Sequence, residues 1–262
     1  MEIWLVDLGR SGAALEACEA TQPRLSDQDV HRLNAIGDRA SRQQRRALAI
    51  SLRLLLARAA GDGRFDRVAF THEPFGKPVL PPALMSQGGI VFSLSHAQDR
   101  GLIAVAREGP IGVDMEGARQ LHMSPARRQA LVNAAAGIAD ESMVVGDATL
   151  GDAIGDDNVL RAWVGLEAYA KALGCGIGHL LTELGVLAPS VAARRAASSA
   201  AIARPRPAGM SVRGVALPGV DGDRGPWFAA VAAPAAVLGG MAPVGVFPQT
   251  EAGLAALVAA KA

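Results

Sequence analysis

The chain has 262 residues and is 50% hydrophobic, which is enough for one large domain or two small domains with real cores. Its 26 Lys and Arg nearly balance its 25 Asp and Glu, giving a formal net charge of +1, so composition favours neither a nucleic-acid partner nor a membrane surface. Its two cysteines, Cys18 and Cys175, belong to no Cys/His cluster, which argues against structural zinc and is typical of a reducing compartment such as the cytoplasm.

The first third of the chain predicts a strand followed by helices. Met1–Asp7 lacks the basic flank and long apolar region of a signal peptide and is expected to be a strand. Ser26, followed by acidic residues, predicts a helix start. Ser41–Ala60 alternates arginine with leucine and alanine and predicts an amphipathic helix that ends at Gly61. Its basic face is either solvated or a phosphate-binding surface, and it carries Arg42, Arg45, Arg46, Arg53 and Arg58.

Short strands and turns are predicted next. A strand is expected at residues 67–71, and Phe75-Gly76-Lys77-Pro78 predicts a turn with a lysine at its tip, which taken alone is a solvent-exposed turn. Strands are then expected at 90–96, ending in His96, at 102–106 and at 111–116. Three short strands joined by tight turns predict an antiparallel meander. In such a sheet His96 would lie near Asp114.

The third of these strands, Ile111-Gly112-Val113-Asp114-Met115-Glu116, carries two acidic side chains. Alternate side chains of a strand share a face, so Asp114 and Glu116 would point the same way, about 6–7 Å apart. Two carboxylates on one face suit a hard divalent cation such as Mg²⁺. The alternative is that the acids merely end the strand at a polar turn.

The next segments predict two helices and an acidic loop. Residues 119–136 have helical tendency, and residues 137–158 form a long acidic loop whose carboxylates are either spare ligands or simply solvated. A helix of about four turns is expected from near Asp156 to the stop at Gly174. Trp163, Glu167 and Lys171 recur every fourth residue and share one face of it, where the plain alternative is a surface Glu-Lys pair.

The rest of the chain is rich in alanine, proline and glycine and carries no apparent chemistry. Strands are expected at 184–187, 211–217 and 227–233, and a terminal helix at 253–262. The uncharged segment 227–247 contains two prolines and several glycines, so a strand, a turn and a second strand are expected there rather than a transmembrane helix.

Four short motifs together carry a resemblance to a known family. Phe75-Gly76-Lys77-Pro78, Phe92-Ser93-Leu94-Ser95-His96, Gly112-Val113-Asp114-Met115-Glu116 and Trp163-x-x-x-Glu167-Ala168-x-x-Lys171-x-x-Gly174 occur in an order and spacing that resembles the 4′-phosphopantetheinyl transferases of the surfactin-synthetase-activating type. The resemblance implies an α+β fold. It would be a pseudo-dimer of two similar halves, each a small antiparallel sheet packed on a long helix. The halves would be residues 1–109 and 110–248, followed by a tail at 249–262.

The resemblance also implies an activity and its partners. Such an enzyme transfers the 4′-phosphopantetheine arm from coenzyme A, held in the cleft between the halves, to a serine of an apo acyl or peptidyl carrier protein. The reaction depends on Mg²⁺, with Mn²⁺ as a substitute, and releases adenosine 3′,5′-bisphosphate. A monomer is implied, and fatty-acid, polyketide and peptide carriers are all candidate acceptors.

Residue by residue, the resemblance implies the following site. Asp114, Glu116 and Glu167 would hold the metal, and Glu167 would alternatively be the base that accepts the serine proton. Lys171 and His96 would serve catalysis and bind phosphate. Displacement at a pyrophosphate needs charge neutralisation more than covalent help, which agrees with such a set. Lys77 would also bind coenzyme A, and either Arg45 or Arg46 would reach the 3′-phosphate.

Two departures from the family pattern motivate an alternative. The family usually has lysine just before the helix glutamate, whereas this chain has Leu166, preceded by Gly165. No glutamate between Arg119 and Ala136 matches the family's additional carboxylate. The alternative is a weak or inactive homologue that binds coenzyme A or a carrier protein on the same fold. Another Mg²⁺-dependent phosphotransferase is a third reading, although the sequence has no P-loop.

Overall fold

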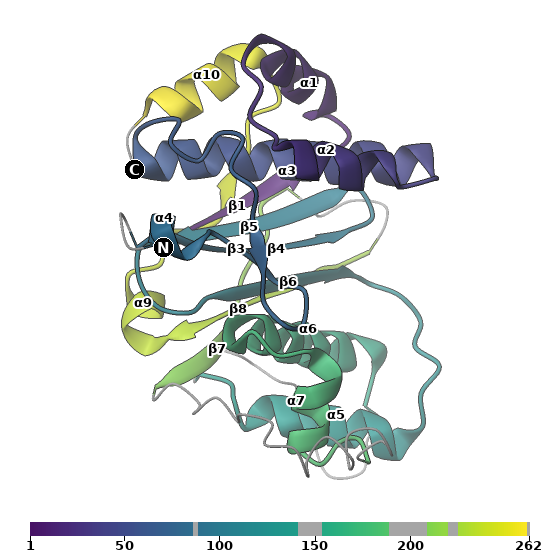
Figure 1. Cartoon of the computed structure of the whole chain (residues 1–262). Helices are drawn as coiled ribbons and strands as arrows, with labels where there is room; N and C mark the ends of the chain where they lie inside the picture. The colour runs from purple at the N-terminus through teal and green to yellow at the C-terminus, as the bar shows by residue number, and fades with distance from the viewer. Residues whose placement is uncertain (86–88, 141–153, 189–208, 220–224, 261–262) are drawn as a thin grey trace. The chain divides into compact units, whose positions relative to one another are not determined.

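The computed structural model describes residues 1–85, 89–140, 154–188, 209–219 and 225–260, and structural statements refer to these ranges (Figure 1). The chain divides into two units, which are described separately. The first unit contains Met1–Gly109, Leu217–Gly219 and Gly240–Ala262, and the second contains Pro110–Ala216 and Val220–Gly239.

The first unit is built on a four-stranded sheet in the order β4-β5-β1-β9. These strands are β1 (Glu2–Asp7), β4 (Val91–Ala97), β5 (Arg100–Ala106) and β9 (Gly245–Val246). β1 and β4 are antiparallel to β5, whereas β9 runs parallel to β1. A separate two-stranded hairpin consists of β2 (Thr71–His72) and β3 (Pro78–Val79).

The helices of the first unit gather around α3 (Arg39–Ala60), which contacts β5 and three other helices. Those helices are α1 (Gly12–Thr21), α2 (Asp27–Asn34) and α10 (Glu251–Ala259). A short helix, α4 (Pro82–Met85), follows β3 in the chain. Figure 1 shows α1 and α10 on the side of α3 that faces away from the sheet. The buried leucines of α3 and the β-branched residues of β5 therefore form the core between helix and sheet, where removal of apolar area from water stabilises the unit.

Residues 240–260 contribute directly to the first unit. The Phe247 amide donates to the Leu5 carbonyl at 2.9 Å, and the Phe247 ring lies edge-on to Trp4 with centroids 6.5 Å apart. Phe247 and Leu254 are both buried in the core of this unit. The segment is thus part of the sheet and of the core rather than an appendage.

The second unit is a three-stranded antiparallel sheet in the order β6-β8-β7, covered by helices. Its strands are β6 (Gly112–Gly117), β7 (Met210–Gly214) and β8 (Trp227–Pro234). The helix α6 (Asp156–Leu173) packs on all three strands, and α5 (Pro125–Ala136) and α7 (Ile177–Glu183) pack on α6. A short α9 (Ala235–Gly239) follows β8. α6 ends at Gly174, whose φ of 67° is the left-handed conformation that glycine adopts easily.

The approach of β6 to α6 depends on Gly112. A Cβ atom at this position would lie 1.9 Å from the Ala168 carbonyl oxygen and 2.5 Å from the Ala172 amide nitrogen. Any larger residue would collide with the helix backbone, so glycine is what allows strand and helix to pack this closely.

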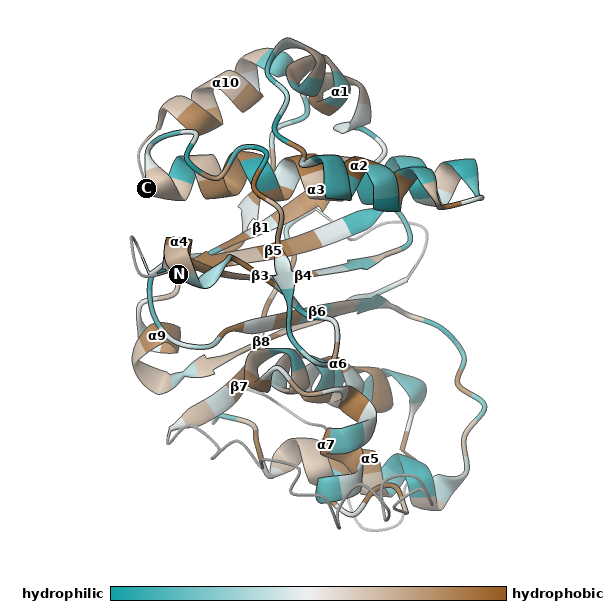
Figure 2. Cartoon of the chain, viewed as in Figure 1, coloured by the Kyte–Doolittle hydropathy of each residue, from teal (hydrophilic) through white to brown (hydrophobic). Residues whose placement is uncertain are grey.

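Several predicted elements are confirmed. The Ser26 start of α2 has a full capping box with Asp29, and α3 ends at Gly61 with φ of 75°. The long helix before Gly174 and the strand at 227–233 are also present, as is the terminal helix. Figure 2 shows α2 as largely hydrophilic, which fits its place at the surface of the first unit.

The predicted meander is wrong. β4 and β5 pair as expected, but β6 pairs with β8 in the other sheet, so His96 and Asp114 are not in one sheet. The turn at residues 107–111 looks like a hairpin in the sequence, yet it connects the two units. β1 occupies the edge of β5 that the meander would have needed.

Other predicted elements also differ. The strand at 67–71 is reduced to β2, and residues 184–187 follow α7 without forming a strand. The helix expected from Arg119 begins at Pro125, capped by the Ser124 hydroxyl. Arg53, placed on the basic face of α3, is 1% exposed and pairs with Asp29 inside the unit. Among the described residues, no helix is both long and apolar enough to cross a bilayer.

Candidate functional site

The second unit carries a group of four charged side chains on β6 and α6. Asp114 and Glu116 pair in register with Ala230 and Phe228 of β8, and their spacing of two puts both on one face of the sheet. Asp114 is 5% exposed, whereas Glu116 is only partly buried. Glu167 and Lys171 lie one turn apart on α6, the helix that packs against β6. We call these four residues the acidic cluster.

Lys171 binds the strand directly. Its Nζ donates to Asp114 Oδ1 at 2.6 Å and to the Val113 carbonyl oxygen at 3.2 Å. The close packing of β6 on α6 at Gly112 is what brings this ammonium group within reach of the carboxylate. A nearly buried carboxylate needs such a partner, because an uncompensated charge there would cost several kcal/mol, about 3–5.

The carboxylates of the cluster act on one another electrostatically. Burial raises the pKa of Glu167, and the negative charges of Asp114 and Glu116 raise it further, while Lys171 lowers it. Burial also raises the pKa of Glu116, with Arg119 opposing and Asp114 reinforcing the effect. Arg119 is close enough for an ion pair, with its Nε 3.7 Å from Glu116 Oε2. Two basic side chains, Arg119 and the partly buried Lys171, face three mutually repelling carboxylates, so the cluster is still short of positive charge.

The donor types in the cluster suit a hard divalent cation. Carboxylate oxygens are the ligands that Mg²⁺ prefers, and the excess negative charge favours binding of a cation. In the ranges that the structure describes, no group of three or more His, Cys, Asp or Glu side chains is arranged to hold a metal ion. Asp114 is instead held by Lys171. The residues therefore fit a metal in donor type and charge, with Asp114 and Glu116 as the first ligands to test and Glu167 as the third.

The acidic segment 137–158 adds no described carboxylate to this cluster. Asp140 pairs with Arg213 at 2.7 Å, and Asp156 pairs with Arg128 at 2.6 Å. The acids at positions 141, 147 and 152 lie outside the described residues.

Position 166 does not face the cluster. Leu166 is 0% exposed and belongs to the hydrophobic core of the second unit, and the adjacent Gly165 is buried as well. A lysine at this position of this chain would place its stem in an apolar core. The leucine is thus accounted for by packing and is not a cation site left vacant.

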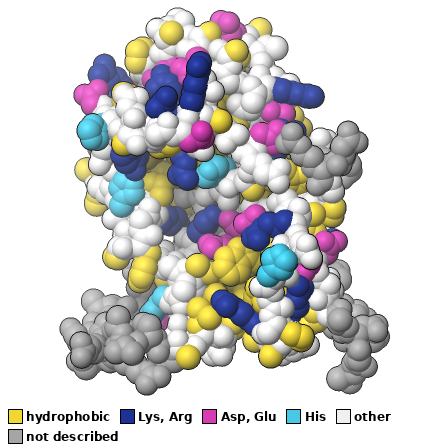
Figure 3. Space-filling model, turned by 90° about the vertical axis from the view of Figure 1, so that its right-hand side faces the viewer, with side chains coloured by type: hydrophobic (Ala, Val, Ile, Leu, Met, Phe, Trp, Pro, Cys, Tyr) yellow, Lys and Arg dark blue, Asp and Glu magenta, His cyan; other side chains and the backbone are white. Residues whose placement is uncertain are grey.

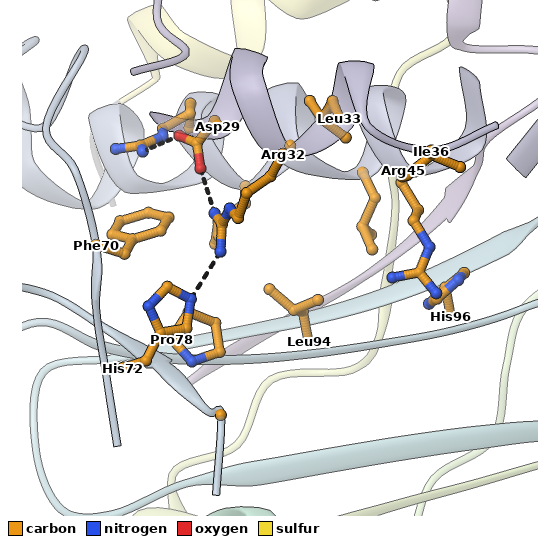
Figure 4. Close-up of a pocket in the computed structure, with 15 residues that line it drawn as sticks. Asp29, Arg32, Leu33, Ile36, Arg45, Phe70, His72, Pro78, Leu94 and His96 are labelled. Carbon is orange, nitrogen blue, oxygen red and sulfur yellow. Dashed lines mark hydrogen bonds and ion pairs between the residues drawn. The ribbon is translucent and has the colours of Figure 1, made fainter. Parts of the chain in front are cut away.

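The first unit contains a pocket of about 370 Å³ bounded by α2, α3, β4 and the β2–β3 hairpin (Figure 4). Its apolar lining includes Leu33, Leu48, Leu52 and Leu94. Five basic side chains and one acidic one also line it: Arg32, Arg45, Arg53, His72, His96 and Asp29. Such a mixture of apolar walls and convergent polar groups is typical of a site for a small ligand.

The basic residues stand at two ends of this pocket. Figure 4 shows Arg45 and His96 at one end of the view, and Arg32 and His72 at the other, with Leu94 between them. Arg32 Nη1 lies 2.7 Å from His72 Nε2, so the two side chains link α2 to the hairpin. The pocket therefore offers cationic groups at both ends of an apolar surface, an arrangement suited to an anion attached to a flat apolar group.

The predicted anion-binding residues are placed unequally. Arg45 and His96 line the pocket, whereas Arg46 points to Glu16, with its Nε 2.7 Å from the Glu16 carboxylate. Lys77 lies in the loop between β2 and β3, and its neighbours Gly76 and Pro78 line the pocket while Lys77 itself does not.

Three pocket residues were missed by the sequence reasoning. Asp29 is one of the acidic residues that follow Ser26 and predict a helix start, and its spacing from Ser26 is that of a capping box. Arg32 follows one turn later on the same helix face, which was a usable signal. His72 carries no comparable signal in the sequence, because only the fold brings the β2–β3 hairpin to α2.

On the face drawn in Figure 3, basic side chains are interspersed with acidic and hydrophobic ones and form no continuous basic surface. This mixed surface agrees with the near-zero net charge. A charged ligand is therefore expected to bind at a local cluster, such as the pocket or the acidic cluster.

The chain was compared with protein-family models and with curated proteins. No protein-family model matches the chain. Over 184 residues the chain is 27% identical to a curated protein, the 4′-phosphopantetheinyl transferase HetI of Nostoc sp., covering 69% of this chain and 71% of HetI. This similarity supports the phosphopantetheinyl transferase family, and a transferase of this kind, for the chain. It does not distinguish the surfactin-synthetase-activating type.

Proposed function

We propose that this protein transfers the 4′-phosphopantetheine arm of coenzyme A to a serine hydroxyl of an apo acyl or peptidyl carrier protein. The observation that carries the proposal is the acidic cluster, in which Lys171 holds Asp114 at 2.6 Å beside Glu116 and Glu167. Similarity to HetI supports the same reaction class. The order of the four sequence motifs further favours the surfactin-synthetase-activating type, from which we expect a monomer that accepts several carriers.

The chemistry required is displacement at phosphorus. The serine oxygen forms a bond to the pantetheine-side phosphorus of the pyrophosphate, and the bond to the bridging oxygen breaks. Adenosine 3′,5′-bisphosphate leaves with that oxygen, and the serine proton passes to a base. The main demand on the protein is to position the groups and to neutralise developing charge.

The residues of the acidic cluster would divide this work. A bound Mg²⁺, or Mn²⁺ in its place, would supply charge neutralisation at the pyrophosphate, with Asp114 and Glu116 as ligands. Lys171 would pair with a phosphate oxygen through a nitrogen that now contacts Asp114. Glu167 has two candidate roles, metal ligand and general base. Glu167→Gln separates them: loss of Mg²⁺ affinity identifies a ligand, and loss of turnover with affinity retained identifies a base.

The pocket of the first unit would hold the adenosine end of coenzyme A. Its apolar lining suits a purine ring, and Arg45 and His96, or Arg32 at the opposite end, suit a phosphate monoester. Of the two helix arginines, Arg45 lines the pocket whereas Arg46 is paired with Glu16, so Arg45 is the better candidate to contact a phosphate of coenzyme A. Dephospho-coenzyme A, which lacks the 3′-phosphate, should therefore bind more weakly than coenzyme A.

The test is intact-protein mass spectrometry of apo carrier proteins incubated with this chain, coenzyme A and Mg²⁺. We expect the carrier to gain one phosphopantetheine, with the gain lost in EDTA and in Glu116→Ala. Glu183→Ala is the matched control, because Glu183 pairs with His179 on α7 and has no part in the acidic cluster. It should transfer at the wild-type rate.

The panel should include fatty-acid, polyketide and peptide carriers. Absence of any gain across the panel, with coenzyme A still bound, would overturn the transferase proposal. That result would identify instead a binding homologue without transfer. Modification of one carrier class alone would contradict the expectation of broad acceptance while leaving the reaction in place.

A further inference from the structure

Asp29 is the centre of a buried ionic network that lies along one wall of the pocket. The residue is 4% exposed, and its carboxylate accepts hydrogen bonds from two arginines and a serine. Oδ1 lies 2.6 Å from Arg32 Nη2, and Oδ2 lies 2.5 Å from Arg53 Nη2 and 2.8 Å from Ser26 Oγ. Figure 4 shows the Asp29 carboxylate joined by a dashed line to the Arg32 guanidinium, which is joined in turn to His72.

The inner arginine is fixed from several sides. Arg53 is 1% exposed and donates to the carbonyl oxygens of Phe65 at 2.9 Å and Val68 at 2.6 Å. Its guanidinium carbon lies 3.8 Å from the centroid of the Phe70 ring, within the range of a cation–π contact. Because Arg53 cannot move without breaking these contacts, it anchors the carboxylate of Asp29.

The outer arginine is held and yet accessible. The Arg32 side chain is 46% exposed, one of its terminal nitrogens is bound to Asp29, and the other contacts His72. A long arginine side chain on a surface helix normally samples many rotamers, and ordering it on ligand binding weakens affinity. Here the network fixes the plane of the guanidinium before any ligand arrives.

We propose that Asp29 is a positioning residue for recognition of a nucleoside phosphate monoester in this pocket, acting through Arg32. The inference rests on the proposed function for the identity of the natural ligand, the adenosine 3′-phosphate end of coenzyme A. Asp29 does not touch the phosphate. It orients the fork of Arg32, whose exposed edge donates to the phosphate oxygens, and its anchor is the chain of contacts through Arg53.

A purely structural role for Asp29 makes a different prediction. The residue also completes the capping box of α2 and pairs with a buried arginine, so its loss will lower stability in either case. A structural role would weaken all nucleotides alike. A positioning role lowers the preference for nucleotides that carry the additional phosphate.

The experiment measures dissociation constants of adenosine 3′,5′-bisphosphate and adenosine 5′-monophosphate by calorimetry, and takes their ratio. For the wild type we expect the bisphosphate to bind more tightly. Asp29→Asn and Arg32→Ala should each reduce this preference about tenfold, and the double variant should reduce it no further, because both changes remove one interaction. Arg32→Lys should also lose the preference, since an ammonium cannot keep the fork geometry.

Asp66→Asn is the matched control. Asp66 forms an ion pair with buried Arg24 in the same unit, in which Arg24 Nη1 donates to both carboxylate oxygens at 2.8 and 2.9 Å, but neither residue lines the pocket. This variant should lose stability and keep the wild-type preference.

Three results would overturn the inference: a wild type with no preference for the bisphosphate, an Asp29→Asn protein that keeps the full preference, or an Arg32→Lys protein equal to the wild type. The Arg32→Lys result decides the matter if Asp29→Asn does not fold, because Arg32 lies at the surface. The binding ratio needs no transfer reaction. A protein that shows the predicted ratios but modifies no carrier would therefore refute the proposed function and leave this inference standing.

Discussion

Gly112→Ala should destabilise the second unit far more than a glycine-to-alanine change at an open position would. The added methyl carbon would lie 1.9 Å from the Ala168 carbonyl oxygen, and real Cβ atoms essentially never approach another atom closer than 3.0 Å. β6 and α6 would have to separate by about 1 Å to relieve the overlap. Because backbone blocks the methyl group on both contacts, no side-chain rotation can make room for it.

The expected cost follows from overpacking. Such insertions cost about 1–3 kcal/mol, and the rigid surroundings put this case at the upper end. With a urea dependence of about 1–3 kcal/mol per molar, the unfolding midpoint should fall by about 1 M or more. Hydrogen exchange should show the loss of protection in β6 and α6 and not in β4 and β5, which belong to the other unit.

The matched control is Gly214→Ala on β7 of the same sheet, where an added Cβ meets nothing within 4 Å. This change should be neutral or stabilising by about 0.4–1 kcal/mol, because alanine restricts the unfolded chain. An unfolding free energy for Gly112→Ala within about 0.5 kcal/mol of the Gly214→Ala value would refute the reasoning. Separation of β6 from α6 would also lengthen the 2.6 Å contact between Lys171 and Asp114, so carrier modification should fall together with stability.

Three further predictions concern charge and packing. Burial raises the pKa of Asp29, but hydrogen bonds from Arg53 and its neighbours outweigh burial and lower it overall. The stability that this carboxylate contributes is therefore present above its unfolded pKa of about 3.9 and is lost as pH falls through the folded pKa, so the deficit of Asp29→Asn in urea titrations should narrow below about pH 4. Lys171→Ala should lower the melting temperature without metal, yet gain more from added Mg²⁺ in a thermal-shift assay than the wild type, because no ammonium then competes for Asp114; an equal gain would argue against a shared site. Phe70→Ala should cost about 3–5 kcal/mol in unfolding free energy, since it removes a buried ring and the surface on which Arg53 lies.

Local signals in the sequence predicted the elements that carry the site. The spacing of Asp114 and Glu116 indicates one face of a strand, and the spacing of Glu167 and Lys171 indicates one face of a helix. Both elements form, and they pack against each other. No pattern in the sequence shows that Gly112 touches α6, so the 2.6 Å contact to Lys171 required the structure.

Pairings between distant segments could not be predicted in the same way. Strand partners depend on which strand edges are unpaired. The second edge of β5 pairs with β1, although β6 is the next strand along the chain. Arg53 shows the corresponding limit for side chains. Its place in a row of arginines predicts a charge at the surface. In the structure the Arg53 charge lies inside the unit, where the Asp29 carboxylate of α2 and the ring of Phe70 stabilise it. The resemblance between the two halves remains a prediction.

The parallel pairing of β9 with β1 determines when the first unit can be finished during synthesis. Residues 110–239 leave the ribosome before β9 and α10 do, so the sheet edge at β1 and the core positions of Phe247 and Leu254 stay incomplete until the second unit has been made. Synthesis of the first unit therefore begins before that of the second unit and ends after it. A fragment that stops at residue 109 would expose an unpaired strand edge, and with it a surface prone to aggregation.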